Sequence, residues 1–406
     1  MTYDIIVIGA GAAGMVAAIE AAKLNKKVCI LEHNDRVGKK ILSTGNGKCN
    51  LTNLKIDKDC YYSDSGEDFF KVIEGFTPQD IIAFFNDLGL YTKNKAGYIY
   101  PLSEQAGAVL DCLRYEAERL HIDVFTNFVA ETITKRKDYF EIEGTGKLCA
   151  QRIILATGSK AAPKTGSRGK GYDIAAGFGH SIVPVIPALV QIKCSDKFCA
   201  ALHGVRCNAK VTLCTDNEII GEESGELQLV DYGISGIPVF QLSRSIKRAI
   251  DSKMKPYILV DFLPEYSMEE LKNLLYHILT RNKELSAIAA LSGILNKKIA
   301  TVILKSAGYS PATECSELSG KSTRELARTI KKFTFHPLDT KGFDNAQICA
   351  GGVSLAEINL DTMESVKVKG LYFAGEILDV DGKCGGYNLT WAFASGHLAG
   401  VSAALD

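Results

Sequence analysis

The chain has 406 residues, of which 46% are apolar and 23% charged, as expected of an ordinary globular protein with two or three domains. Its 47 basic and 47 acidic residues cancel, and this balance argues against a nucleic-acid partner, because binding to phosphate backbones needs a basic surface. No apolar run reaches the roughly 18 to 20 residues of a membrane span, and no signal sequence precedes the first strand, so we expect a cytoplasmic protein with no membrane partner.

The N-terminal stretch has the order of a dinucleotide-binding βαβ unit. An apolar run over residues 4–8 predicts a buried parallel strand, and the glycines that follow open a helix over residues 15–23. A second apolar strand over residues 28–31 ends in Glu32, whose carboxylate is expected to bind a ribose hydroxyl of an adenosine. The turn and the helix N-terminus are expected to hold the pyrophosphate through Gly9, Gly11, Ala12, Ala13 and Gly14.

A polar, glycine-rich loop after Glu32 favours FAD over NAD as the dinucleotide. An NAD site needs no such extension, whereas the ribityl chain and ring of FAD run on past the pyrophosphate and must be lined by backbone. A surface loop rich in turn-forming residues is the structural alternative. The residues of this region that we predict to bind FAD are His33, Gly38, Lys39, Lys40, Thr44, Gly45, Asn46, Gly47, Cys49 and Asn50.

A second segment typical of flavoproteins lies near residue 155. A buried strand over residues 153–155 ends in Ala156-Thr157-Gly158, where small residues let the chain pass close under the dinucleotide. By analogy with such flavoproteins, Val129 is expected beside the adenine. Residues 165–179 also include many glycines, but no apolar strand leads into them, so no second nucleotide site is expected there.

The C-terminal segment is expected to close the flavin site. Residues 370–376 form a strand and a tight turn that end in Gly375 and Glu376, and the carboxylate of Glu376 is expected on a ribityl hydroxyl. Gly386-Tyr387-Asn388 then opens the final helix, over residues 389–404. Its N–H groups are expected to face the flavin edge on which negative charge develops on reduction. A C-terminal helix that only packs is the alternative.

Between these two parts the sequence changes character. Strand patterns predominate over residues 188–264, and helical spacing of apolar residues over residues 265–335. We therefore predict an α/β protein with a Rossmann-like FAD-binding domain of the glutathione-reductase type. This domain is formed by residues 1–187 and 336–406, and the intervening residues form an inserted substrate domain that is β-rich and then helical.

Several motifs resemble those of one bacterial family. Residues 45–53 (Gly-Asn-Gly-Lys-Cys-Asn-Leu-Thr-Asn), 350–353 and 370–393 are similar to the BaiN/YhiN-like, or aminoacetone-oxidase-like, FAD-dependent oxidoreductases. The likeness covers essentially the whole chain. The sequence departs from the family at Lys48, where arginine is usual, and in the variable run at Cys384.

The resemblance implies an FAD enzyme with one of two activities. One is reduction of activated C=C bonds, as in 3-oxo bile-acid or steroid-like substrates, with NADH or NADPH as a diffusible electron donor. The other is oxidation of an amine, such as aminoacetone or an amino acid, with production of hydrogen peroxide. A flavin-containing module that binds RNA or senses redox state is an alternative of another class.

Three residues are candidates for chemistry on a small-molecule substrate. Tyr232 lies in a loop that resembles a family loop facing the flavin, and Tyr387 flanks the expected flavin edge, so either could orient or protonate a substrate. Cys49 is a lone thiol in the loop expected near the ring. A structural role is the alternative for each. No cysteine or histidine spacing fits a metal site, and no pattern indicates an oligomeric state.

Overall fold

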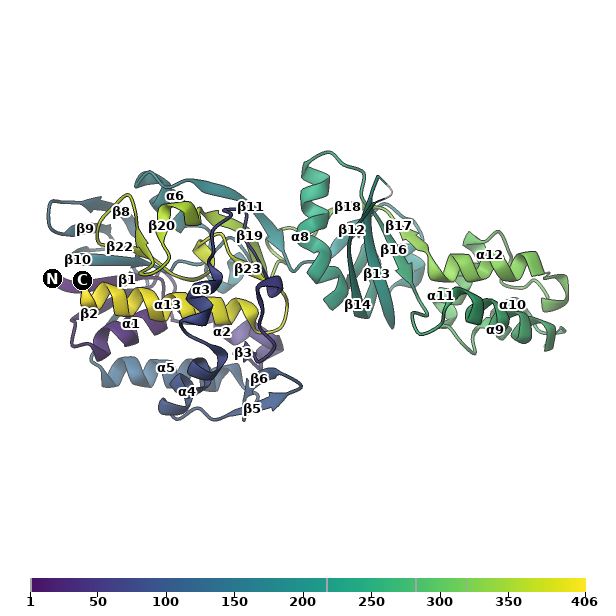
Figure 1. Ribbon diagram of the computed structural model, residues 1–406, viewed down its shortest axis with the longest axis horizontal. Helices are drawn as coiled ribbons and strands as arrows, with labels where there is room; N and C mark the ends of the chain where they lie inside the picture. Colours follow the sequence, from purple (N-terminus) through teal and green to yellow (C-terminus); the bar gives the residue numbers. More distant parts are fainter. Residues whose placement is uncertain (1, 217, 282, 319) are drawn as a thin grey trace. The chain divides into compact units, whose positions relative to one another are not determined.

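The computed structural model describes residues 2–216, 218–281, 283–318 and 320–406 (Figure 1). The chain divides into two compact units: unit 1 comprises Met1–Ile186 and Gln347–Asp406, and unit 2 comprises Pro187–Ala346. Each unit is built around its own cluster of buried apolar side chains. Among the described residues, no helix is long and apolar enough to cross a membrane.

The central sheet of unit 1 is parallel where the nucleotide-binding pattern was expected. β1 lies between β10 and β2, β22 pairs with β10, and β7 pairs with β2, all in the parallel sense. β2 and β22 are wholly buried, as expected of parallel strands covered on both faces. The strands of this sheet are β1 Thr2–Ile8, β2 Val28–Leu31, β7 Asp123–Phe125, β8 Ala130–Lys135, β9 Phe140–Gly144, β10 Lys147–Leu155, β20 Ile358–Asn359, β21 Glu364–Ser365 and β22 Leu371–Phe373.

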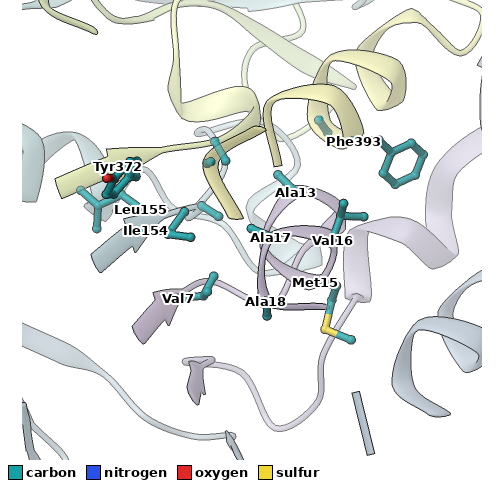
Figure 2. Packing of buried hydrophobic residues seen from close by; sticks show 14 of the residues in the cluster. Val7, Ala13, Met15, Val16, Ala17, Ala18, Ile154, Leu155, Tyr372 and Phe393 are labelled. Atoms are coloured by element: carbon teal, nitrogen blue, oxygen red, sulfur yellow. The ribbon is translucent and has the colours of Figure 1, made fainter. Parts of the chain in front are cut away.

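Two long helices cross closely in unit 1. The buried side chains of α1 (Ala12–Lys23) form one cluster with those of the sheet and of α13 (Tyr387–Leu405), as Figure 2 shows. A Cβ on Gly396 would lie 2.5 Å from Ala13 O, and a Cβ on Gly400 would lie 2.3 Å from Ala17 O. Glycine at these positions of α13 therefore allows the two helix backbones to touch.

Shorter elements complete unit 1. The helices are α2 Lys39–Ser43, α3 Phe70–Glu74, α4 Pro78–Asp87, α5 Ala106–Arg119 and α6 Lys170–Gly177. β3 (Thr52–Asn53), β6 (Tyr98–Pro101) and β5 (Thr92–Lys95) form a small antiparallel sheet. Two further pairs are β4 (Tyr61–Tyr62) with β23 (Asp381–Gly382), and β11 (Ile182–Ala188) with β19 (Ile348–Val353).

Unit 2 contains an antiparallel sheet followed by a group of helices. The strand order is β17-β16-β13-β14-β15-β12-β18. Its strands are β12 Ile192–Cys194, β13 Val205–Thr215, β14 Glu218–Val230, β15 Gly233–Gly236, β16 Tyr257–Asp261, β17 Phe333–Phe335 and β18 Pro337–Thr340. Its helices are α7 Cys199–Leu202, α8 Ile237–Asp251, α9 Met268–Arg281, α10 Ala287–Leu291, α11 Lys297–Ser306 and α12 Gly320–Lys331.

The chain leaves unit 2 later than the sequence suggested. β17 pairs with β16 and β18 pairs with β12, so both strands extend the sheet of unit 2. The division consequently falls between Ala346 and Gln347, whereas the sequence analysis placed it between residues 335 and 336. The difference arises because Pro337 pairs with Cys194, a partner far away in the sequence that no local pattern indicates.

Candidate functional site

The turn between β1 and α1 leaves open space at its second glycine. A Cβ on Gly9, whose φ is +106°, would lie 2.4 Å from Ala156 O, and a Cβ on Gly14 would lie 1.9 Å from Gly9 O. These two glycines are required by the packing of the turn itself. A Cβ on Gly11, in contrast, would meet no described atom within 4 Å. Space at this glycine, beside an α1 N-terminus that carries no side-chain cap, suits the pyrophosphate of a dinucleotide.

Glu32 is anchored at the end of β2. Its carboxylate is buried; Oε2 accepts a hydrogen bond from Ala10 N at 2.9 Å, and Oε1 accepts two from Asn34 N and Nδ2 at 2.9 and 2.6 Å. Phe128 N donates to Glu32 O, which brings the neighbouring Val129, 49% exposed, to the same end of the sheet. The structure thus places Glu32 and Val129 together beside the glycine turn.

The loop after Glu32 is tied to this turn and is conformationally unusual. Gly38 N donates to Ala10 O at 2.9 Å. Further along, Asn46 and Cys49 both have φ of +54°, a conformation that non-glycine residues rarely adopt and that is concentrated at functional sites. The other residues predicted to bind FAD lie in the same loop. His33 Nε2 contacts Gly166 O, and Lys39 forms an ion pair with Asp35. Thr44 Oγ1 donates to Ile41 O, and Gly45 and Gly47 also have positive φ.

Asn50 and Cys49 are both buried, with different consequences. Asn50 Oδ1 has no hydrogen-bond partner among the described residues, and a buried acceptor without a partner is costly unless a ligand or water satisfies it. Cys49 is completely buried, and burial raises the pKa of its thiol to about 11, although a hydrogen bond with Thr44 acts in the opposite direction. The thiol is therefore protonated at neutral pH, which favours packing over nucleophilic chemistry.

The segment Ala156-Thr157-Gly158 passes beside the glycine turn, as Ala156 O lies against Gly9. Thr157 Oγ1 is also buried without a described partner, but it faces α6, since a Cβ on Gly171 would lie 1.8 Å from it. The side chain of Thr157 therefore points into the protein. Gly158 has φ of +70°, which keeps the backbone of this segment in a tight turn.

Glu376 joins three segments that are remote in sequence. Lys40 Nζ lies 2.6 Å from Oε2, and Oε1 accepts hydrogen bonds from Ser159 Oγ at 2.7 Å and Cys349 N at 3.0 Å. Sequence reasoning missed Ser159 and Cys349; Ser159 directly follows the Ala-Thr-Gly signal, whereas nothing local marks Cys349. Gly375 lies against α1, because a Cβ on it would be 2.8 Å from Ala13 Cβ.

The N-terminus of α13 is packed against β3, which follows Cys49 and Asn50 in the chain. Asn53 Nδ2 donates to Gly385 O at 3.1 Å, and Thr52 Oγ1 and Thr390 Oγ1 are 2.7 Å apart. Gly386, at the N-cap, has φ of +97° and no side-chain cap, so this end of a 19-residue helix keeps its positive dipole.

The side chains of Tyr387 and Asn388 are engaged by the protein. Tyr387 is 9% exposed, its hydroxyl donates to Lys55 O at 3.2 Å, and burial raises its pKa. Asn388 bonds both N and O of Gly382 at 2.8 Å. Both contacts favour positioning of this helix end over direct chemistry by these side chains.

Tyr232 belongs to unit 2, whereas Cys49 and Tyr387 belong to unit 1. It lies on the turn between β14 and β15, half-buried, with Lys341 Nζ 4.0 Å from the centroid of its ring. Burial, and then the nearby Asp231, raise the pKa of Tyr232, so the hydroxyl is protonated at neutral pH. In the described part of the chain, no group of three or more His, Cys, Asp or Glu side chains is arranged to hold a metal ion.

The chain is similar over nearly its whole length to several known proteins. The family described as HI0933-like protein Rossmann domain matches residues 3–402. The 3-dehydro-bile acid delta(4,6)-reductase of Clostridium scindens is 42% identical over 401 residues, which cover 98% of both chains. The ribosomal RNA dihydrouridine synthase of Haemophilus influenzae is 29% identical over 98% of this chain and 97% of that protein. A flavocytochrome c3 fumarate reductase in its open conformation is 16% identical, with a TM-score of 0.48 over all of this chain and 78% of the other.

The family match and the match to the bile-acid reductase confirm the resemblance inferred from the motifs, the α/β class with a Rossmann-type nucleotide-binding domain, and the expectation of an oxidoreductase. The family match and the open glycine turn together support FAD as the cofactor. The chain belongs to the family of HI0933-like Rossmann proteins.

Proposed function

We propose that this protein is an FAD-dependent reductase that adds hydrogen across a C=C bond conjugated to a carbonyl, in a 3-oxo steroid-like substrate, with NADH or NADPH as donor. The observation that carries the proposal is the 42% identity, over 98% of both chains, to an enzyme named as a 3-dehydro-bile acid delta(4,6)-reductase. Identity at this level across the full length, without a large insertion or deletion, favours the same class of reaction.

The residues of unit 1 fit an FAD molecule. Gly11 leaves room for a pyrophosphate, Glu32 ends the strand beside which the adenosine is proposed to lie, and Asn50 Oδ1 is a buried acceptor with no partner among the described residues. When bound, FAD supplies hydride-transfer chemistry, while the protein supplies orientation and electrostatics. The N-terminus of α13 is the proposed source of positive potential for charge that develops during reduction.

A proton must accompany the hydride, and Tyr232 is the proposed proton donor. Its side chain is half-buried and protonated at neutral pH, and Lys341 lies close to its ring. Tyr387 is less suited to this role because its hydroxyl already donates to Lys55 O. Cys49 is assigned to packing because its thiol is buried and protonated.

Reduction of uridine in ribosomal RNA is the second candidate. The Haemophilus influenzae protein named for dihydrouridine synthesis matches 98% of this chain, although at 29% identity. Uridine also contains a C=C bond conjugated to a carbonyl, so the same chemistry would serve both substrates. The zero net charge of the chain favours the small-molecule substrate.

A product assay tests the proposal. The FAD-loaded protein is incubated without oxygen with NADPH or NADH and a 3-oxo-4,6-diene bile acid, and the product is identified by mass. A mass gain of two hydrogens is expected, and the FAD-free protein serves as the control. Reduction of uridine in RNA transcribed in vitro, with no reaction of the diene, would favour the second candidate. Peroxide formed from an amine in air would instead favour an oxidase.

A further inference from the structure

The small antiparallel sheet of unit 1 presents two tyrosine rings on one face. Ile99 and Pro101 of β6 are buried. Tyr98 and Tyr100 alternate with them along the strand, so their side chains point to the opposite face of the sheet. Tyr98 is 41% exposed, whereas Tyr100 is half-buried. Tyr100 is therefore the more enclosed of the two.

The two rings lie against backbone at or next to residues predicted to bind FAD. A Cβ on Gly45, whose φ is +55°, would be 3.8 Å from Tyr100 Cε1, so this ring lies beside the glycine-rich loop. A Cβ on Gly385 would be 2.7 Å from Tyr98 Cε1, so that ring lies on the backbone that leads into α13. Tyr100 consequently borders the predicted flavin loop, and its neighbour on the same face borders the N-terminus of α13.

The hydroxyl of Tyr100 has no hydrogen-bond partner among the described residues. Two more deeply buried tyrosines of unit 1 differ in this respect, since Tyr61 donates to Tyr387 O at 3.1 Å and Tyr387 donates to Lys55 O at 3.2 Å. Burial raises the pKa of Tyr100, so its hydroxyl keeps its proton at neutral pH. This hydroxyl is thus available to donate a hydrogen bond to a ligand.

Positive charge predominates beside this hydroxyl. Lys48, Lys93 and Lys95 all form ion pairs with the carboxylate of Glu104. This cluster lies close to Tyr100, because Lys48 acts to lower the pKa of the tyrosine and Glu104 acts to raise it. Three ammonium groups around one carboxylate leave a net positive charge, which favours a ligand oxygen on which negative charge develops.

A half-buried tyrosine often only packs, because its ring is apolar and its hydroxyl reaches water. A second polar group beside Gly45 favours a ligand instead. Asn50 is 8% exposed, its Cβ would be 3.9 Å from a Cβ on Gly45, and its Oδ1 has no partner among the described residues. A buried acceptor and a half-buried donor thus flank the same glycine, and packing alone accounts for neither.

We propose that the hydroxyl of Tyr100 donates a hydrogen bond to the carbonyl oxygen of the substrate and stabilises the enolate that hydride addition creates. This inference rests on the proposed function, because it assigns a residue to the carbonyl end of the same conjugated substrate. Hydride forms a C–H bond at the far carbon of the conjugated C=C, and the π electrons move to the carbonyl oxygen. Tyr100 retains its proton throughout. The proton that Tyr232 donates then forms the second C–H bond, the carbonyl re-forms, and Tyr232 recovers a proton from water.

The test combines two steroid ligands with two forms of the FAD-loaded protein in a double-mutant cycle. Estradiol has a phenolic oxygen on its first ring, at the position of the enolate oxygen, and 3-deoxyestradiol lacks this oxygen. Calorimetry is expected to give about tenfold tighter binding of estradiol to the wild type, and equal binding of the two ligands to Tyr100→Phe. Tyr100→Phe is also expected to lower kcat on the diene about 10²-fold, with FAD content and Tm unchanged.

Tyr91→Phe is the matched control. Tyr91 directly precedes β5 of the same small sheet and is 68% exposed, so this variant is expected to bind both ligands and to reduce the diene like the wild type.

Three outcomes would overturn the proposal. Equal binding of the two ligands by the wild type, or no binding of either, would show that no donor at this face meets the steroid oxygen. A preference for estradiol that persists in Tyr100→Phe would assign the hydrogen bond to another residue. Loss of FAD, or of both ligands, from Tyr100→Phe would show that Tyr100 has a structural role.

The binding cycle needs no turnover, so it separates this proposal from the proposed function. A protein that prefers estradiol through Tyr100 but reduces no diene would refute the proposed function and leave the hydrogen bond standing. Reduction of the diene at equal rates by the wild type and Tyr100→Phe would refute the role of Tyr100 and leave the proposed function standing.

Discussion

Lys40 Nζ lies 2.6 Å from Glu376 Oε2, an ion pair between residues 336 positions apart. The same carboxylate accepts hydrogen bonds from Ser159 Oγ and Cys349 N, so a single side chain connects four segments of unit 1. Three of these segments were predicted from the sequence to bind FAD. The arrangement of the proposed cofactor site therefore depends on the partly buried carboxylate of Glu376.

The first prediction concerns Glu376→Gln. Removal of the charge leaves Lys40 without its carboxylate and weakens two hydrogen bonds, each worth about 1.5–3 kcal/mol when one partner is charged. We expect FAD affinity to fall about tenfold in a fluorescence titration, and Tm to fall by several degrees. Asp361→Asn removes an exposed partner of Lys71 and is expected to change neither quantity. If Glu376→Gln bound FAD as tightly as the wild type, the ion pair and hydrogen bonds of Glu376 would not contribute to cofactor binding.

The second prediction compares two glycines of the same turn. Gly11→Val adds a side chain in open space, at a φ of −83° that valine tolerates, so the protein is expected to fold but to retain no FAD. Gly14→Val forces Cβ to within 1.9 Å of Gly9 O, and we expect it to be insoluble or unfolded. Circular dichroism and the flavin absorbance distinguish the two. A folded Gly11→Val protein with full flavin content would show that the pyrophosphate does not bind at this turn.

The third prediction compares two tyrosines. Tyr232→Phe removes the proposed proton donor, and kcat is expected to fall about 10²-fold or more with KM little changed, because general acids contribute 10²–10⁴-fold. Tyr387→Phe removes a hydroxyl that is hydrogen-bonded to Lys55 O and to Cys60, so its kcat is expected to stay within a few-fold of the wild type. A larger loss of kcat in Tyr387→Phe than in Tyr232→Phe would identify Tyr387 as the proton donor instead.

The fourth prediction concerns stability in acid. Burial acts to raise the pKa of Glu357, but the ion pair with Lys367 and the hydrogen bonds from Ser181 outweigh it and lower the pKa to about 2, from an ordinary 4.5. The folded state therefore binds this proton more weakly than the unfolded state. Its stabilising contribution is complete above pH 4.5 and is lost as the pH falls towards 2.

Thermal melts between pH 2 and pH 7 check this assignment. Glu357→Gln is expected to lower Tm at pH 7 and to reduce its dependence on pH between 4.5 and 2, whereas the exposed Glu131→Gln leaves the profile unchanged. Identical profiles for Glu357→Gln and the wild type would show that this pair does not contribute to acid stability.

Local patterns predict the nucleotide-binding strands well. β1, the glycine turn and β2 follow from an apolar run, three glycines and a second apolar run, because each of these signals acts over a few residues. Helices α1 and α13 begin three and two residues earlier than predicted, since residues of the glycine segments join their first turns.

Contacts between remote segments are not predictable in this way. The pairing of β18 with β12 extends unit 2 to Ala346, and the contact of His33 Nε2 with Gly166 O joins two loops that are 133 positions apart. A single sequence records none of these long-range relationships.

The central claim is that one FAD site accepts hydride from a nicotinamide donor and passes it to a C=C bond. The most direct test follows the flavin absorbance of the FAD-loaded protein without oxygen, first on addition of NADPH and then on addition of a 3-oxo-4,6-diene bile acid. We expect the flavin to bleach with NADPH and to recover its colour with the diene, one equivalent for each flavin. A flavin that bleaches but is not reoxidised by the diene, or that no nicotinamide bleaches, would contradict the claim.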